Sequence, residues 1–193
     1  MRIALTGTPG TGKTSVARIL RESGDDVIDL NDVAASFGFL GPYDRRRRTR
    51  DVDLKALARH LARTLPKKGR VFLEGHFAHL LPVERAIVLR CSPAVIRRRL
   101  ARRGYPAAKI RENCLAEALD EITIEAVGKL GKSRVCEIET TKQSARNVAA
   151  VIRRLARTGF RRSKKYRPGR IDFSDEIIKN PAYYTRPISR RPR

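Results

Sequence analysis

Short apolar runs alternate with longer stretches of helical periodicity along most of the chain. The runs expected to form strands are Arg2–Thr6, Val27–Asp29, Val71–Leu73, Ala86–Leu89 and Val135–Ile138. Between them, apolar residues recur at i, i+3, i+4 and i+7, which is typical of helices that pack on one face. The clearest helical stretches are 13–21, 54–65, 95–100 and 148–155. Short apolar strands separated by helices predict a parallel sheet covered on both faces. We therefore expect an α/β, doubly wound fold of three layers.

The character of the sequence changes near residue 159. The segment Phe160–Arg193 contains 11 Lys and Arg against 3 Asp and Glu, with prolines that break long elements. We predict one domain over residues 1–158 and a basic, Pro-containing, largely extended C-terminal extension over 159–193. Aromatic residues among its cations could stack on bases while the cations neutralise phosphates. The alternative is a disordered, solubilising tail.

Composition favours a folded protein that lies outside membranes. The hydrophobic fraction is 41%, yet no apolar run approaches the roughly 20 residues that span a bilayer. The three cysteines, Cys91, Cys114 and Cys136, have no metal-ligand spacing, and an odd number fits a reducing compartment. Without a recognisable signal peptide, we expect a cytoplasmic protein with no membrane partner.

The net charge of +23 is the most unusual bulk property, and arginine outnumbers lysine about three to one. A positive surface speeds association with polyanions, and guanidinium groups bind phosphate oxygens in pairs. Compositional drift in an arginine-rich genome is an equal alternative for the body of the chain. In the C-terminal extension we favour a functional origin.

Residues Gly7–Thr14 fit the pattern G-x-x-x-x-G-K-[ST] at every fixed position, and they follow a predicted strand and open a predicted helix. In this P-loop, glycines such as Gly10 and Gly12 let successive backbone N–H groups converge on phosphate oxygens at a helix N-terminus. Lys13 is expected to reach the β- and γ-phosphates of a nucleoside triphosphate. A chance glycine-rich turn is the competing interpretation, and the full pattern in its context argues against it.

The residues around the P-loop suggest a magnesium-dependent site. The Thr14 hydroxyl is expected to ligate Mg²⁺, and Ser15 to bind an α-phosphate oxygen. Glu74 follows the strand Val71–Leu73, where ligands collect in open α/β sheets, and it could hold the metal through water. A surface carboxylate is the alternative. His76 lies within reach of the same crevice and could orient or deprotonate an attacking group, although a lone histidine is more often structural.

A cluster of arginines predicts a short lid over the phosphates. The stretch Arg97–Tyr105 contains five arginines on an expected helix that ends at Gly104, and a second helix begins near Pro106. Phosphoryl transfer spreads negative charge over the equatorial oxygens, and arginines stabilise that charge. Most of the five arginines are expected to face solvent. Arg103, at the joint of the two helices, is our candidate for nucleotide binding and catalysis.

Taken together, these motifs resemble the atypical adenylate kinases of the isoenzyme-six type, a family whose members also act as ribosome-assembly ATPases. The residues that carry the resemblance, which spans about 1–156, are Gly7–Thr14, Leu30-Asn31-Asp32, Glu74-Gly75-His76 with Leu81-Pro82, and Arg103-Gly104-Tyr105 with Lys109 and Asn113. Ordinary adenylate kinases have Asp-Gly-Phe-Pro-Arg where this chain has Glu74-Gly75-His76-Phe77.

The resemblance implies a P-loop nucleoside monophosphate (NMP) kinase fold with a five-stranded parallel sheet, an NMP-binding segment near 27–51 and a short lid near 98–108. It implies the reversible reaction of ATP and AMP to two ADP with Mg²⁺, and a slow ATPase activity. It also implies a small-subunit ribosomal protein and rRNA as partners, in small-subunit maturation. By position, Glu74 matches the family's Walker-B-like acid, and His76 matches its histidine.

Two positions depart from the family. The acid is Glu74 where the family usually has Asp, and one extra methylene can be absorbed by a water-mediated metal contact. The run Arg45–Arg48 is basic where the family often has acids, and it could bind the AMP phosphate or RNA. Three functions therefore remain open: an AMP kinase, an assembly ATPase that binds RNA and has little kinase activity, and a kinase of a small metabolite such as shikimate or gluconate on the same fold.

Overall fold

The computed structural model describes residues 1–44, 49–66, 68–160 and 163–185. The strands are β1 (Arg2–Thr6), β2 (Asp26–Asp29), β3 (Leu40–Asp44), β4 (Thr49–Val52), β5 (Val71–Glu74), β6 (Arg85–Arg90) and β7 (Val135–Glu139). The α-helices are α1 (Lys13–Glu22), α2 (Leu30–Ser36), α3 (Leu54–Thr64), α4 (Pro93–Arg102), α5 (Ala107–Ala118), α6 (Glu121–Leu130), α7 (Ala145–Arg157), α8 (Asp175–Lys179) and α9 (Pro181–Thr185). The 3-10 helices are η1 (Ala78–Leu80), η2 (Lys132–Arg134) and η3 (Ser163–Tyr166).

Five parallel strands form the central sheet in the order β2-β5-β1-β6-β7, which confirms the predicted fold class. All five predicted strands are present, each with the predicted residues at its centre. In β1, Ile3 and Leu5 face one apolar cluster while Ala4 faces the other. Because both faces of the sheet are buried, its strands need apolar side chains at nearly every position, and this produced the continuous apolar runs in the sequence.

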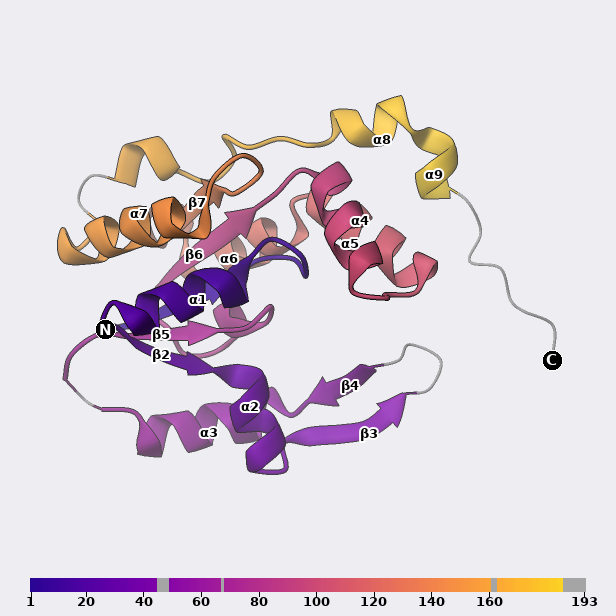
Figure 1. Ribbon diagram of the computed structural model, residues 1–193. Helices are drawn as coiled ribbons and strands as arrows, with labels where there is room; N and C mark the ends of the chain where they lie inside the picture. The colour runs from indigo at the N-terminus through magenta and orange to yellow at the C-terminus, as the bar shows by residue number, and fades with distance from the viewer. Residues whose placement is uncertain (45–48, 67, 161–162, 186–193) are drawn as a thin grey trace.

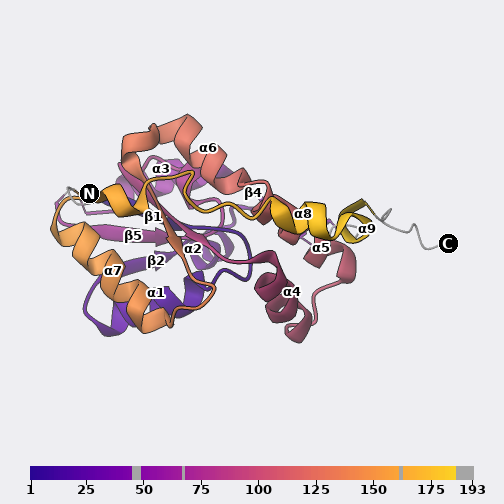
Figure 2. The same cartoon turned by 90° about the horizontal axis from the view of Figure 1, so that it is seen from above.

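Helices cover the sheet on both sides (Figure 2). On one face, α1 and α7 pack together through Val16, Leu20, Ile152 and Leu155. The other face is covered by α3 and α6. Because the five strands are parallel, their carboxyl ends meet at one edge of the sheet, where the loops that follow β1, β5 and β6 lie close together.

Two attachments lie beyond that edge (Figure 1). One is the antiparallel β3–β4 hairpin with α2, within the predicted segment 27–51. The other is the helix pair α4 and α5, joined by residues 103–106, which contains the predicted lid 98–108. Gly104 adopts φ 71°, a left-handed conformation that glycine tolerates best, and so ends the first of the two helices as the sequence predicted.

The C-terminal extension returns over the body of the protein. Phe160 and Pro168 are buried, and the chain then passes along β7 to reach α8 and α9 (Figure 1). Tyr183 and Tyr184 pack against the apolar cluster that α4 and α5 share. These short helices were not predicted from the sequence, since the extension has no sustained apolar periodicity. None of the helices in the described ranges is long and apolar enough to cross a membrane.

Candidate nucleotide site

A cleft of about 990 Å³ opens at the carboxyl edge of the sheet. The P-loop lies at its floor, the α4–α5 joint on one side and the β3–β4 hairpin on the other. All of the site residues predicted from the sequence line this one cleft: Gly10, Gly12, Lys13, Thr14, Ser15, Glu74, His76 and Arg103. The structure thus brings together residues that are up to 93 positions apart in the chain.

The P-loop adopts backbone conformations that require glycine. Gly7, Gly10 and Gly12 have φ values of 139°, 95° and 101°. A Cβ at Gly7 would also collide with the carbonyl oxygen of Leu89 on β6, so this position excludes any side chain. The Lys13 ammonium donates to the carbonyl oxygens of Gly7, at 2.7 Å, and of Thr8, at 3.2 Å. The lysine side chain therefore folds back and bonds to the backbone of its own loop.

Neighbouring elements also hold the P-loop from outside. Arg99 on α4 donates from Nη1 to the Gly10 carbonyl at 2.8 Å. The Thr140 hydroxyl donates to the Thr11 carbonyl at 2.8 Å. The Thr8 hydroxyl donates to a carboxylate oxygen of Glu117 on α5 at 2.5 Å. These contacts hold the loop through two of its carbonyl groups and through the side chain of Thr8.

Lys13 and Glu74 are both buried at the base of the cleft, and each alters the other's ionisation. Desolvation lowers the pKa of Lys13 to about 8, against the attraction of Glu74 and Glu117. Desolvation also raises the pKa of Glu74 to about 7, and the nearby charge of Asp29 and a hydrogen bond to it act in the same direction. Asp29 ends β2 directly beside Glu74 on β5.

His76 lies at the mouth of the cleft, on the loop that follows β5. The Thr6 hydroxyl donates to its carbonyl oxygen at 2.9 Å and contacts His79 Nδ1 at 3.1 Å. The other ring nitrogen of His79 lies 3.0 Å from Glu125 on α6, which holds the loop in place. Desolvation, and then the charge of Lys13, lower the pKa of His76 to about 4. The His76 ring is therefore neutral at physiological pH and can accept a hydrogen bond.

The α4–α5 joint places cations over the P-loop. Arg103 is exposed, lines the cleft, and is close enough to Lys13 to lower the pKa of that lysine. Lys109 on α5 also lines the cleft and pairs with Glu112 at 3.0 Å. Asn113 donates to the Lys109 carbonyl at 2.6 Å. Of the five arginines in the predicted lid helix, Arg99 binds the loop backbone, while Arg103 faces the cleft.

The opposite side of the cleft is formed by the β3–β4 hairpin. Arg50 and Tyr43 line it, and the Arg50 guanidinium lies 5.9 Å from the centre of the Tyr43 ring. Nη1 of Arg50 also donates to the Gly41 carbonyl at 3.2 Å. The run Arg45–Arg48, for which the sequence predicts an AMP-phosphate or RNA contact, lies outside the described residues.

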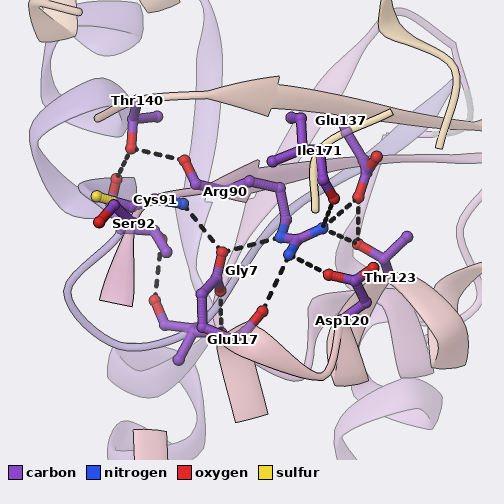
Figure 3. Close-up of polar contacts among 12 residues, drawn as sticks. Gly7, Arg90, Cys91, Ser92, Glu117, Asp120, Thr123, Glu137, Thr140 and Ile171 are labelled. Atoms are coloured by element: carbon purple, nitrogen blue, oxygen red, sulfur yellow. Dashed lines mark hydrogen bonds and ion pairs between the residues drawn. The ribbon is translucent and has the colours of Figure 1, made fainter. Parts of the chain in front are cut away.

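Behind the P-loop, Arg90 at the end of β6 forms a buried ionic network (Figure 3). Its guanidinium pairs with Glu117 at 2.8 Å, with Glu137 at 2.5 Å and with Asp120. Despite desolvation, these carboxylates raise the pKa of Arg90 above its ordinary value, and the arginine stays charged. Sequence reasoning missed this network because its members are 27 to 47 positions apart and no local pattern relates them.

The donor set of the cleft suits Mg²⁺ rather than a transition metal. Thr14 and Glu74 in its lining offer hard oxygen atoms, which Mg²⁺ prefers, and Asp29 lies beside Glu74, where its carboxylate caps α2. The raised pKa of Glu74 beside Asp29 shows two carboxyl groups whose repulsion a cation would relieve. Among the residues that the structure describes, no group of three or more His, Cys, Asp or Glu is placed to hold a metal unaided. Nucleotide phosphates would therefore supply further ligands.

Comparison with known proteins agrees with this geometry. A family model described as an AAA domain matches residues 3–120. A protein of Archaeoglobus fulgidus named "Putative adenylate kinase" is 40% identical over 177 residues, which cover 92% of this chain and 94% of the relative. A protein of the same name from Methanothermobacter thermautotrophicus is 42% identical over 177 residues, covering 91% of this chain and 99% of the relative.

A solved structure of shikimate kinase from Acinetobacter baumannii, in complex with shikimate, superposes with a TM-score of 0.55. At 21% identity over 82% of this chain and 93% of that chain, it shows a shared fold alone. The two archaeal relatives match at far higher identity along nearly their whole lengths, and they confirm the resemblance to adenylate kinases drawn from the motifs. This chain therefore belongs to the family of archaeal adenylate kinases that these two proteins represent.

Proposed function

We propose that the protein transfers the γ-phosphate of ATP to AMP and forms two ADP. The observation that carries this proposal is one cleft, in which the P-loop lies between the cationic α4–α5 joint and the hairpin that carries Arg50. Its volume of about 990 Å³ lies at the upper end of the range for small-molecule sites, as expected for two nucleotides. The family names agree with this reaction.

The donor nucleotide is bound from the P-loop side. Lys13 binds the β- and γ-phosphates, leaving its present carbonyl partners, while the backbone N–H groups at Gly10 and Gly12 cradle the β-phosphate. Ser15 at the start of α1 binds an α-phosphate oxygen. Arg103 bends over the transferring group from the lid joint and stabilises the charge on its equatorial oxygens.

Thr14 and Glu74 form the side of the cleft that would hold Mg²⁺, and the carboxyl group of Asp29 lies beside Glu74. When bound there, the ion would neutralise charge on the phosphate oxygens and help to align them. Glu74 is well placed for a contact through water, since it is buried at the end of β5 below the loop. As the carboxylate, it also attracts the ammonium of Lys13 and keeps that side chain directed across the floor of the cleft.

The acceptor enters from the hairpin side. Arg50 supplies a cation for the AMP α-phosphate, and His76 lies between the hairpin and the P-loop in the cleft lining. Because its imidazole is neutral, His76 can accept a hydrogen bond from the acceptor and orient it for in-line attack. Holding both phosphates in one desolvated cleft supplies much of the acceleration in this reaction class.

The test is an acceptor screen with the full chain, ATP and Mg²⁺. ADP is followed by a coupled assay, with AMP, GMP, CMP, UMP, shikimate and gluconate as acceptors. We expect rapid ADP formation with AMP and only slow ATP hydrolysis without an acceptor. Absence of any rate above that background with every nucleotide would contradict the proposal, and a rate with shikimate or gluconate would support the metabolite-kinase alternative.

A second function is favoured by the charge distribution. In a chain of net charge +23, four exposed cations of the described extension lie within seven residues: Lys164, Lys165, Arg167 and Arg170. We propose that the protein also contacts rRNA and a ribosomal protein of the small subunit, and that its ATPase activity serves small-subunit maturation. Replacing these four cations by Ser should weaken binding to small-subunit rRNA and reduce its salt dependence. Unchanged affinity and salt dependence would contradict the RNA contact.

A further inference from the structure

Glu117 joins helix α5 to the P-loop and to the end of β6. One carboxylate oxygen accepts the Thr8 hydroxyl at 2.5 Å, and the other accepts Arg90 Nε at 2.8 Å and the Cys91 N–H at 2.9 Å. The Glu117 side chain is only 2% exposed. A buried carboxylate with three well-formed hydrogen bonds is fixed in position. It therefore also restricts the movement of the groups that donate to it.

Arg90 is held from the other side by the C-terminal extension (Figure 3). Its Nη1 lies 3.4 Å from the Ile171 carbonyl, and the Phe173 ring centre is 5.5 Å from its guanidinium carbon. The Gly169 N–H donates to Glu137, which also binds Arg90, at 2.8 Å. Segment 169–173 therefore closes over the same guanidinium that orients Glu117.

We propose that Glu117 is a positioning residue for the P-loop, that it acts through Thr8, and that segment 169–173 helps to set nucleotide affinity through Arg90. Thr8 occupies one of the variable positions of the P-loop pattern, so its hydroxyl is not required by the motif itself. That hydroxyl is nevertheless committed to Glu117 in a buried, charge-assisted hydrogen bond. The inference rests only on the triphosphate-binding part of the proposed function.

Two features argue that Glu117 does more than neutralise Arg90. Arg90 has two other carboxylate partners, Glu137 and Asp120, so its charge is balanced without Glu117. In addition, the charge of Glu117 acts on Lys13 and favours its ammonium form. Glu117 thus holds the loop through its hydrogen bond with Thr8, and it also stabilises the positive charge of Lys13.

The first experiment measures ATP affinity by titration calorimetry with Mg²⁺ and no acceptor, for a matched pair of variants. Thr8→Val keeps the shape of the side chain and removes its donor, while Thr8→Ser keeps the donor. We expect Thr8→Val to bind ATP roughly tenfold more weakly, because a charge-assisted hydrogen bond is lost, and Thr8→Ser to stay close to the parent. Equal affinity in the two variants would contradict the inference alone, whereas a parent that binds no ATP would contradict the proposed function as well.

A double-mutant cycle separates action through Glu117 from direct contact between Thr8 and the nucleotide. Glu117→Gln should weaken ATP binding in the parent, since a neutral amide replaces the carboxylate, and should have a clearly smaller effect in Thr8→Val, where only its charge near Lys13 remains to be lost. Thermal melts check that both variants are folded. Fully additive effects of the two changes on ATP affinity would overturn the assignment of Glu117 as a positioning residue.

The contribution of the extension is tested with a pair of its aromatic residues. Phe173→Ala removes the ring over Arg90, and we expect ATP affinity to fall about threefold, since the ring acts on the P-loop only indirectly, through Arg90 and Glu117. Tyr166→Phe is the control, because it removes a hydroxyl that pairs with Arg154 and leaves Arg90 untouched. The same affinity in both variants would show that segment 169–173 does not act on the P-loop.

Discussion

The two sides of the cleft are built in different ways. On the P-loop side, Thr8, Thr11 and Lys13 are buried. Thr8 and Thr11 are hydrogen-bonded to neighbouring elements, and Lys13 is hydrogen-bonded to the loop itself. On the side of the β3–β4 hairpin, none of the described side chains is fully buried. Since buried hydrogen bonds resist local opening, the loop is preorganised for its ligand, while the hairpin can adjust to one. A kinase that holds its donor nucleotide rigidly can position different acceptors by moving only the acceptor side of its cleft.

The largest effect that we expect from this difference is on stability. Arg90→Met should lower the free energy of unfolding by about 3–5 kcal/mol, because Glu117 and Glu137 stay buried without their cation. Arg50→Met on the hairpin should change it by no more than ~0.5 kcal/mol. Urea unfolding followed by circular dichroism measures both. Similar losses in the two variants would show that the sides of the cleft do not differ in rigidity.

A second effect concerns catalysis on the P-loop side. Lys13→Met should reduce kcat by about 10²–10³-fold, as when a preorganised donor is removed from a transition state. Stability should not fall, since burial already disfavours this ammonium and lowers its pKa to about 8. Coupled assays and thermal melts provide the two readouts, and the exposed Lys68→Met is the control. A large loss of stability in Lys13→Met would show that the lysine is structural.

A third, smaller effect is the pH dependence of stability at Glu74. Its pKa of about 7 in the folded protein exceeds the ordinary 4.5. Between pH 4.5 and pH 7 the unfolded chain therefore releases a proton that the folded protein keeps. Stability should therefore fall as pH rises from about 5 to 7, by on the order of 2 kcal/mol relative to Glu74→Gln, and level off above. Parallel unfolding curves at each pH measure the difference. A constant difference across this range would contradict the raised pKa.

The smallest effect is expected on the hairpin side during turnover. Arg50→Met should raise the KM for AMP about three- to tenfold, through loss of one charged phosphate contact, and leave the KM for ATP unchanged. Arg157→Met, an exposed change at the C-terminal end of α7 and outside the lining of the cleft, serves as the control. Initial rates with either substrate varied separate the two constants. An equal rise in both would place Arg50 outside the acceptor side.

Local sequence patterns were sufficient for the P-loop side of the site. The strand before Gly7, the glycines and the helix from Lys13 follow one another in sequence, so backbone geometry alone assembles them. Glu74 was predicted from its place at the end of an apolar strand, because parallel strands end at a common edge. The comparisons agree with the fold and the family, while the roles of the individual site residues stay predictions.

Other parts could not be predicted, for identifiable reasons. Helix α6 carries Ile122, Ala126 and Leu130 at helical spacing, but its β-branched residues and Gly128 are weak helix formers and obscured that signal. The partners of Arg90 are brought together only by the tertiary fold. Arg99 was one of five similar arginines, and nothing in their order indicates that this one donates to Gly10. Asp29 was missed because its importance comes from its strand register with Glu74.

Gly7 shows that one residue of a ligand-binding motif can be required by the packing of the fold and not by the ligand. Its missing side chain makes room for the Leu89 carbonyl on the neighbouring strand, a constraint that holds whether or not a nucleotide is bound. A descendant that lost Lys13, and with it phosphate binding, would still need glycine here in order to fold. A degenerate P-loop that keeps the glycine equivalent to Gly7 is therefore evidence of shared ancestry and fold. Only the lysine equivalent to Lys13 is evidence of phosphate binding.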